Sequence, residues 1–262
     1  MATTALALPE RLPPEAVRAR AAPLTGALRI ELDPPDRDGW IGQAQFADPD
    51  AEPFAALYSR FAAAGFGSTR RAAAASLLLR YGWAAGFQIA AWLEHGAVLH
   101  LDRYALKFSA STLIEAVWAQ ELRIEQPADP AEGRAALLAS LIAFAEPLVA
   151  SQHAWSRFSR HALWSMVVSS WAAQFAAIGE RLGQRDAAVA EAQALFALSP
   201  QIAHAAPQTY VVSVGRNSRV CQVRAACCLY YKGPAKQFCV SCPIIPREER
   251  LARNREFTCP TG

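Results

Sequence analysis

The chain has 262 residues, of which 53% are hydrophobic and 19% charged, and its formal net charge is +3. The apolar fraction is too high and the net charge too low for an intrinsically disordered protein. A chain of this length can bury a substantial core, either as one large domain or as a domain with an appended module. The composition therefore predicts a compact folded protein.

The first 50 or so residues are rich in proline and acidic residues, and the sequence DPPDRDGW at 33–40 marks a turn region. Residues 27–32 have the pattern of a short strand. No early basic region is followed by an unbroken apolar run, so we expect no secretory signal.

Residues 51–95 have helical spacing and predict two helices, separated by the glycine-containing sequence AGFGSTR at 64–70. Two β-like pieces follow at 98–102 and 104–108 and predict a hairpin or strand pair, with a third strand at 122–125. The tryptophans fall in segments expected to be helical, and most are expected in the core.

Residues 131 to about 198 return to a helical pattern, with breaks expected near Pro147 and Gly183, and QTYVVSV after Pro207 predicts one more strand. The predicted fold class is α+β, predominantly helical with a few short strands and a C-terminal cysteine-rich segment. We divide the chain into a helical platform at 1–210 and a C-terminal segment at 211–262.

Two stretches approach the hydrophobicity of membrane helices, at 74–93 and 162–179. The first contains Arg80 and Gln88, and the second is only eighteen residues long and contains three serines and a glutamine. We interpret both as buried helices of a soluble protein. A cytoplasmic location is expected, and peripheral association with the inner face of the membrane is compatible with it.

All six cysteines lie between Cys221 and Cys259. In a cytoplasmic protein, clustered cysteines are more often metal ligands or redox groups than disulfides. The central sequence CCLYYKGPAKQFCVSCP has an adjacent pair, ten intervening residues and then C-x-x-C, which gives four candidate ligands: Cys227, Cys228, Cys239 and Cys242. Iron–sulfur clusters take four thiolates from short chain segments, and this spacing predicts such a centre.

Two alternatives for the cysteines stay open. Four thiolates also bind zinc, although an adjacent pair is a poor zinc knuckle, which usually has the form C-x-x-C. The second alternative is that the cysteines form disulfides. Cys221 and Cys259 lie outside the central motif, and we expect neither to be a ligand.

The C-terminal segment is also basic. From residue 211 onward the chain has nine lysines and arginines and three glutamates. The net charge of this part is therefore +6, and that of the rest of the chain is −3. An iron–sulfur centre with four thiolates is anionic, so nearby cations would stabilise its reduced state. No recognition motif accompanies these charges, and nucleic-acid binding is not expected.

The cysteine motif resembles the C-terminal signature of the FhuF-like ferric siderophore reductase family, CC-x10-C-x-x-C, and matches its spacing in full. A weaker similarity lies in SRHALWSMVVSS from Ser159. The resemblance implies that the four cysteines hold a [2Fe–2S] cluster. It also implies one-electron reduction of iron(III) in a hydroxamate-type siderophore, with the electron supplied by an external donor. Candidate residues for siderophore contact or cluster tuning are Arg160, Arg216, Arg219, Arg224, Lys232 and Lys236.

Two other functions remain as alternatives: an iron–sulfur electron carrier or redox and iron sensor, and a zinc-stabilised interaction protein. The sequence contains no G-x-S-x-G, H-E-x-x-H or P-loop motif. GFGSTR at 65–70 lacks the third glycine and the preceding strand of a dinucleotide-binding loop, so we expect a turn between helices there.

Overall fold

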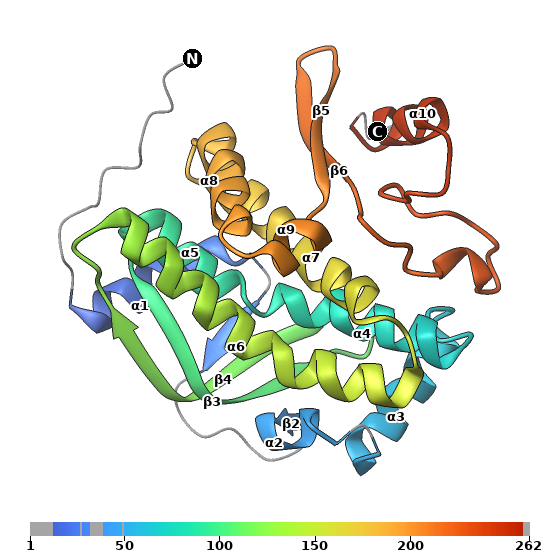
Figure 1. The fold of residues 1–262 in the computed structure, drawn as a ribbon, viewed down its shortest axis with the longest axis horizontal. Helices are drawn as coiled ribbons and strands as arrows, with labels where there is room; N and C mark the ends of the chain where they lie inside the picture. Colours follow the sequence, from blue (N-terminus) through green and yellow to red (C-terminus); the bar gives the residue numbers. More distant parts are fainter. Residues whose placement is uncertain (1–12, 27, 32–38, 49, 259–262) are drawn as a thin grey trace.

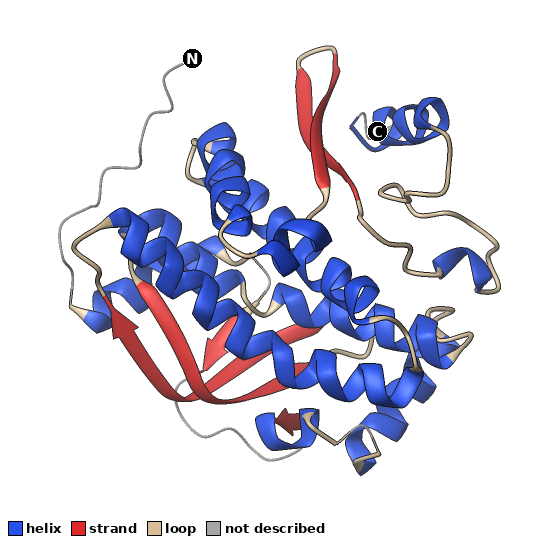
Figure 2. Ribbon diagram, in the orientation of Figure 1, coloured by secondary structure: helices blue, strands red, loops and turns tan. Residues whose placement is uncertain are grey.

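The computed structural model describes residues 13–26, 28–31, 39–48 and 50–258. Helices dominate, and they are accompanied by a four-stranded sheet and a separate two-stranded hairpin (Figures 1 and 2). The predicted α+β, mostly helical class is confirmed. Most of the predicted turn at 33–40, the start of the chain and Cys259 lie outside the described residues.

The four-stranded sheet has the order β1-β4-β3-β2, with β1 parallel to β4 and the other pairs antiparallel. Its strands are β1 (Arg29–Glu31), β2 (Trp40–Gly42), β3 (Val98–Phe108) and β4 (Ile114–Glu125). The predicted division of 98–108 into two strands is wrong. The register with β4 shifts between Leu101 and Tyr104, and this irregularity changes the alternation pattern without ending the strand.

The first half of the platform is built from short helices around this sheet. They are α1 (Pro14–Leu24), α2 (Gln43–Phe46), α3 (Glu52–Ala63), α4 (Arg70–Trp83) and α5 (Gly86–His95). The AGFGSTR sequence forms the predicted turn between helices, and the Thr69 hydroxyl begins α4 by accepting a hydrogen bond from the Ala72 N–H at 3.1 Å. A further turn at Ala84 and Ala85 makes three helices of the predicted two in this region.

The second half of the platform contains α6 (Pro130–Ser156), α7 (Arg160–Arg181), α8 (Arg185–Ala197) and α9 (Pro200–Ala205). The expected break at Gly183 is confirmed, but the break at Pro147 is wrong because α6 continues through it. Phe144 before this proline and Leu148 after it are both buried, so packing on the two sides stabilises the continuous helix against the lost N–H.

The core lies where α4, α5 and α6 meet the sheet and where α7 packs against α4. The Tyr81 hydroxyl contacts that of Tyr104 and donates to the Phe144 carbonyl at 2.9 Å, which joins α4, β3 and α6. Trp164 and Trp171 of α7 are fully buried and meet edge to face at 6.0 Å. Not every tryptophan follows the prediction, because Trp118 lies on β4 and Trp83 is 44% exposed.

Helices α6 and α7 are long and apolar enough to span a membrane by length and composition. However, 56% and 89% of their most apolar stretches are buried inside the fold, as in the core of a soluble protein. The predicted stretch at 74–93 is divided between α4 and α5.

The C-terminal segment extends beside the platform (Figure 1). It consists of β5 (Gln208–Val214), β6 (Asn217–Val223), the short 3-10 helix η1 (Tyr230–Lys232) and α10 (Arg247–Thr258). Strand β5 was predicted and its partner β6 was not. The predicted boundary between residues 210 and 211 falls inside β5.

Candidate metal centre at the C-terminal cysteines

The sulfurs of two cysteines of the central motif, Cys228 and Cys239, lie 3.8 Å apart. Burial raises the pKa of Cys227, and the nearby Cys242 and Cys239 thiols raise it further. The Cys228–Cys239 contact joins one member of the adjacent CC to one member of the C-x-x-C, and all four cysteines are free thiols. Cys228 and Cys242 are buried, while Cys227 and Cys239 are half-buried.

The chain reverses sharply after the CC pair. Leu229 has a left-handed backbone with φ of +61°, which is uncommon for a non-glycine residue, and its N–H donates to the Cys227 sulfur at 3.3 Å. At the other end of the ten-residue segment, the ring of Phe238 stacks on Tyr231 at 4.9 Å. These two contacts close the segment so that its flanking cysteines meet.

The turn between α3 and α4 supports this segment from the platform side. Gly233 approaches Gly65 so closely that an added Cβ would lie 2.5 Å from the Gly65 carbonyl oxygen. Beside it, Tyr230 stacks on Phe66 at 5.5 Å. Gly233 is therefore required for this close approach.

Helix α7 holds the start of the motif. The Ser165 hydroxyl accepts a hydrogen bond from the Ala226 N–H at 3.0 Å, directly before the CC pair. Ser165 is fully buried, and Cys228 packs into the platform's hydrophobic core. The SRHALWSMVVSS sequence on this helix was part of the family resemblance, but Ser165 was not among the predicted site residues.

Helix α10 holds the C-x-x-C loop by its main-chain carbonyls. Arg250 donates to the carbonyls of Cys242 and Ile245, both at 3.1 Å. Arg253 donates to the Phe238 carbonyl at 2.9 Å, and Asn254 donates to the Val240 carbonyl at 2.9 Å. Sequence patterns predicted only the positive charge of the two arginines, although the i, i+3, i+4 spacing of Arg250, Arg253 and Asn254 places the three side chains on one helix face.

The Arg224 side chain contacts a cysteine sulfur. Its Nη1 donates to the Cys239 sulfur at 3.3 Å, and its N–H donates to the Ser241 carbonyl at 3.1 Å. The hydrogen bond from Cys228, assisted by the Arg224 guanidinium and the Ser241 hydroxyl, lowers the pKa of Cys239 to about 5 although burial opposes this. The Cys228–Cys239 contact and burial together raise the pKa of Cys228. A thiolate at Cys239 is the form that binds metals.

The other predicted cations lie in different surroundings. Arg219 on β6 lines a cavity described below, and Arg216 lies exposed in the turn between β5 and β6. Lys232 and Lys236 are exposed on the ten-residue segment. Arg160 forms an ion pair with Glu146 of α6.

The donor set suits a metal centre with tetrahedral sulfur coordination. Two sulfurs on one tetrahedral metal, with bonds of ~2.3 Å, are separated by about 3.8 Å. The Cys228–Cys239 separation of 3.8 Å matches this value. Among the residues that the structure describes, no group of three or more His, Cys, Asp or Glu side chains is placed to hold a metal ion as it stands.

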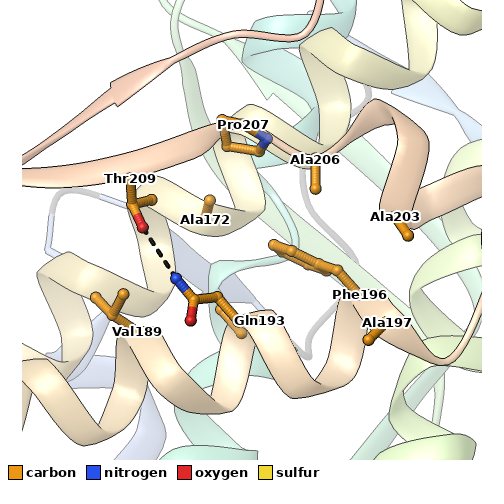
Figure 3. Close-up of a pocket in the computed structure, with 10 residues that line it drawn as sticks. Ala172, Val189, Gln193, Phe196, Ala197, Ala203, Ala206, Pro207 and Thr209 are labelled. Atoms are coloured by element: carbon orange, nitrogen blue, oxygen red, sulfur yellow. Dashed lines mark hydrogen bonds between the residues drawn. The ribbon is translucent and has the colours of Figure 1, made fainter.

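Two cavities lie between the platform and the C-terminal segment. The larger, of about 390 Å³, reaches the cysteine loop at Arg224 and Ser241. The smaller, of about 160 Å³, lies between α7, α8, α9 and the start of β5, where Gln193 donates to Thr209 at 3.2 Å (Figure 3). Half of its lining residues are alanines, and Phe196 and Val189 add further apolar surface.

Comparison of the sequence with models of known families and with curated proteins finds no match.

Proposed function

We propose that the protein is a cytoplasmic ferric siderophore reductase in which Cys227, Cys228, Cys239 and Cys242 hold a [2Fe–2S] cluster. The single observation that carries the proposal is the contact between the free thiols of Cys228 and Cys239, which lie at the sulfur separation of a tetrahedral metal. A two-iron cluster needs two cysteines on each iron. The contact supports Cys228 with Cys239 on one iron, which leaves Cys227 and Cys242 for the other. The resemblance of the motif to FhuF-like reductases supplies the substrate class.

When bound, such a cluster supplies one electron at a time. In the proposed reaction, iron(III) held by hydroxamate oxygens accepts one electron and becomes iron(II), and the external donor loses that electron. Hard oxygen ligands hold iron(II) far less tightly than iron(III), so the reduced metal leaves the chelate. No covalent intermediate with the protein is required.

The chain's own residues prepare the centre for this chemistry. The Arg224 guanidinium and the Leu229 N–H donate to cysteine sulfurs, and such donors favour an electron-rich centre. The half-buried positions of Cys227 and Cys239 leave an edge of the site within reach of solvent. The carbonyl contacts of α10 keep the C-x-x-C loop in position.

The packing of α6 and α7 as core helices supports a cytoplasmic location. The excess positive charge of the C-terminal segment suits peripheral contact with the anionic inner face of a membrane.

The first test is the composition of anaerobically purified protein. We expect two irons and two acid-labile sulfides per chain, and an electron paramagnetic resonance signal after dithionite reduction that identifies a [2Fe–2S] cluster. Cys239→Ser should lower iron and sulfide to background, whereas the matched control Cys221→Ser should retain both. A colourless wild-type protein that contains one zinc would instead identify an interaction protein.

The second test separates a reductase from an electron carrier or sensor. The dithionite-reduced protein should be reoxidised by iron(III) trihydroxamate complexes at a rate that saturates with their concentration. Reoxidation by ferricyanide, which needs no binding site, provides the reference. Equal and unsaturable rates with both oxidants would contradict the reductase function.

A further inference from the structure

We propose that the cavity between α7, β6 and the C-x-x-C loop binds the ferric chelate beside the cysteines, an inference that rests on the proposed function. The cavity has a volume of about 390 Å³, within the range of small-molecule sites. Its walls come from α4, α7, β6, the C-x-x-C loop and α10, so the platform and the C-terminal segment both contribute.

The cavity shares residues with the candidate metal centre. Arg224 lines the cavity and at the same time donates to the Cys239 sulfur at 3.3 Å. Ser241 lines it as well and lies in the chain between Cys239 and Cys242. A ligand in the cavity would therefore be separated from the cysteine sulfurs by little more than one layer of side chains, a suitable arrangement for electron transfer without direct bonding.

Two buried polar groups on the walls lack partners among the described residues. The Ser169 hydroxyl on α7 belongs to a fully buried residue, and the Arg224 Nε is buried beside the cysteines. Each is a hydrogen-bond donor, and leaving a buried donor unpaired costs about 1–3 kcal/mol. A ligand rich in oxygen atoms would satisfy both.

The remaining wall residues define the ligand further. Ala173, Ala176 and Ala177 form an apolar wall on α7, and Leu79 and Trp83 of α4 line the cavity as well. Such a surface suits the hydrocarbon linkers of a chelator. Two arginines line the opposite side, against a single glutamate among the lining residues, so the charge favours a neutral or anionic ligand. An iron(III) trihydroxamate centre is neutral, and its outer oxygens accept hydrogen bonds.

The binding step involves no covalent change. The electron then passes to iron(III), giving iron(II) in the chelate, and the external one-electron donor of the proposed function is oxidised.

The test fills the cavity without touching the cysteines. Ala176→Trp places a large ring on its apolar wall, and Ala203→Trp in the smaller cavity of Figure 3 is the matched control. Binding is measured by calorimetry with the gallium(III) complex of desferrioxamine E, a neutral cyclic trihydroxamate complex that cannot be reduced under these conditions. Iron and sulfide contents of both variants serve as the check on the metal centre.

We expect Ala176→Trp to weaken gallium chelate binding at least tenfold and to abolish saturation of the reoxidation rate with the iron(III) complex. Its reoxidation by ferricyanide should stay unchanged. Ala203→Trp should behave as wild type in all three measurements. A subtler variant, Ser169→Ala, keeps the inference testable where the tryptophan disturbs folding, and it should weaken binding several-fold.

Wild-type affinity in both Ala176→Trp and Ser169→Ala would overturn the cavity assignment, and so would equal weakening in Ala203→Trp. In these cases a saturable wild-type reaction would leave the reductase function standing. A wild-type protein that carries its cluster but binds no trihydroxamate chelate would overturn the reductase function and the cavity assignment together.

Discussion

The platform at 13–206 and the C-terminal segment at 207–258 are stabilised in different ways. The largest fully buried side chains all belong to the platform, among them Trp164, Trp171 and Tyr81. The segment buries few apolar residues, of which three are cysteines and the others are Val212 and Ile245. Its loops are held mainly by hydrogen bonds from α10 to main-chain carbonyls. The platform therefore folds by apolar burial, whereas we expect the stability of the segment to depend on the proposed metal centre.

This dependence follows from size. A few dozen residues with little apolar surface to bury rarely fold stably without a disulfide or a metal. Because a metal centre binds the folded arrangement and not the unfolded one, its binding free energy contributes directly to folding.

The largest predicted effect is the loss of order in the segment when the metal of the proposed centre is removed. Chelation under reducing anaerobic conditions should lower the hydrogen-exchange protection of residues 224–246 by orders of magnitude. The amides of α4, α6 and α7 should keep their protection, measured in the same exchange experiment. Unchanged protection of 224–246 in the metal-free protein would mean that its own contacts suffice.

The second largest predicted effect is on the stability of the platform alone. Glu191 is buried and accepts a two-pronged ion pair from Arg134 at 2.8 and 2.9 Å and a hydrogen bond from Trp92 at 3.0 Å. Glu191→Ala leaves the Arg134 charge without its partner, so we expect the free energy of unfolding to fall by about 3–5 kcal/mol. Urea unfolding followed by circular dichroism measures this.

Asp186→Ala is the matched control on the same helix, because its carboxylate is 83% exposed in its pair with Arg185. That change should stay within about 0.5 kcal/mol of wild type. Iron content should be unaffected in both variants. A loss of iron in folded Glu191→Ala protein would contradict the separation of the two regions.

The same contrast explains what the sequence could predict. In the platform, periodic apolar residues located most helices and strands, since burial of one face produces the pattern. Prediction was wrong at Pro147 and within 98–108, where packing around Phe144 and a register shift near Arg103 override local signals. In the segment, ligand spacing predicted the four cysteines as a set, and the structure brings two of them, Cys228 and Cys239, into contact.

The surroundings of the cysteines were not predictable in the same way. Ser165 is separated from Ala226 by 61 residues in sequence, and Gly65 from Gly233 by many more, so no local pattern connects them. The α10 side chains donate to main-chain carbonyls. Every residue has such a carbonyl, so the sequence does not show which ones accept these hydrogen bonds. Strand β6 was missed because its polar composition lacks the apolar alternation of a half-buried strand.

A smaller effect is expected at the contact between the two regions. Ser165→Ala removes the acceptor of the Ala226 N–H, which is part-buried next to the CC pair. We expect local destabilisation of about 1–2 kcal/mol, seen as faster exchange of the amides at 225–229. Ser170→Ala is the control on the same helix, because its hydroxyl donates to Leu79 within the platform. Equal acceleration at 225–229 in both variants would show that the effect spreads through α7 and does not depend on this contact.

The smallest predicted effect concerns the reduction potential. Reduction adds a negative charge at the cysteines, and the Arg224 guanidinium, which donates to Cys239 at 3.3 Å, stabilises that charge. Arg224→Gln removes the cation, so the reduced state becomes less favourable and the midpoint potential becomes more negative. A shift of roughly 60 mV is expected, a tenfold change in the equilibrium constant for one electron. A redox titration followed by electron paramagnetic resonance measures it.

Arg216→Gln is the control. It removes the same charge from the exposed turn of the hairpin, where solvent screens it, and should leave the potential within experimental error. Equal shifts in the two variants would mean that the potential responds to the overall charge of the segment and that the hydrogen bond to Cys239 has no special part in it.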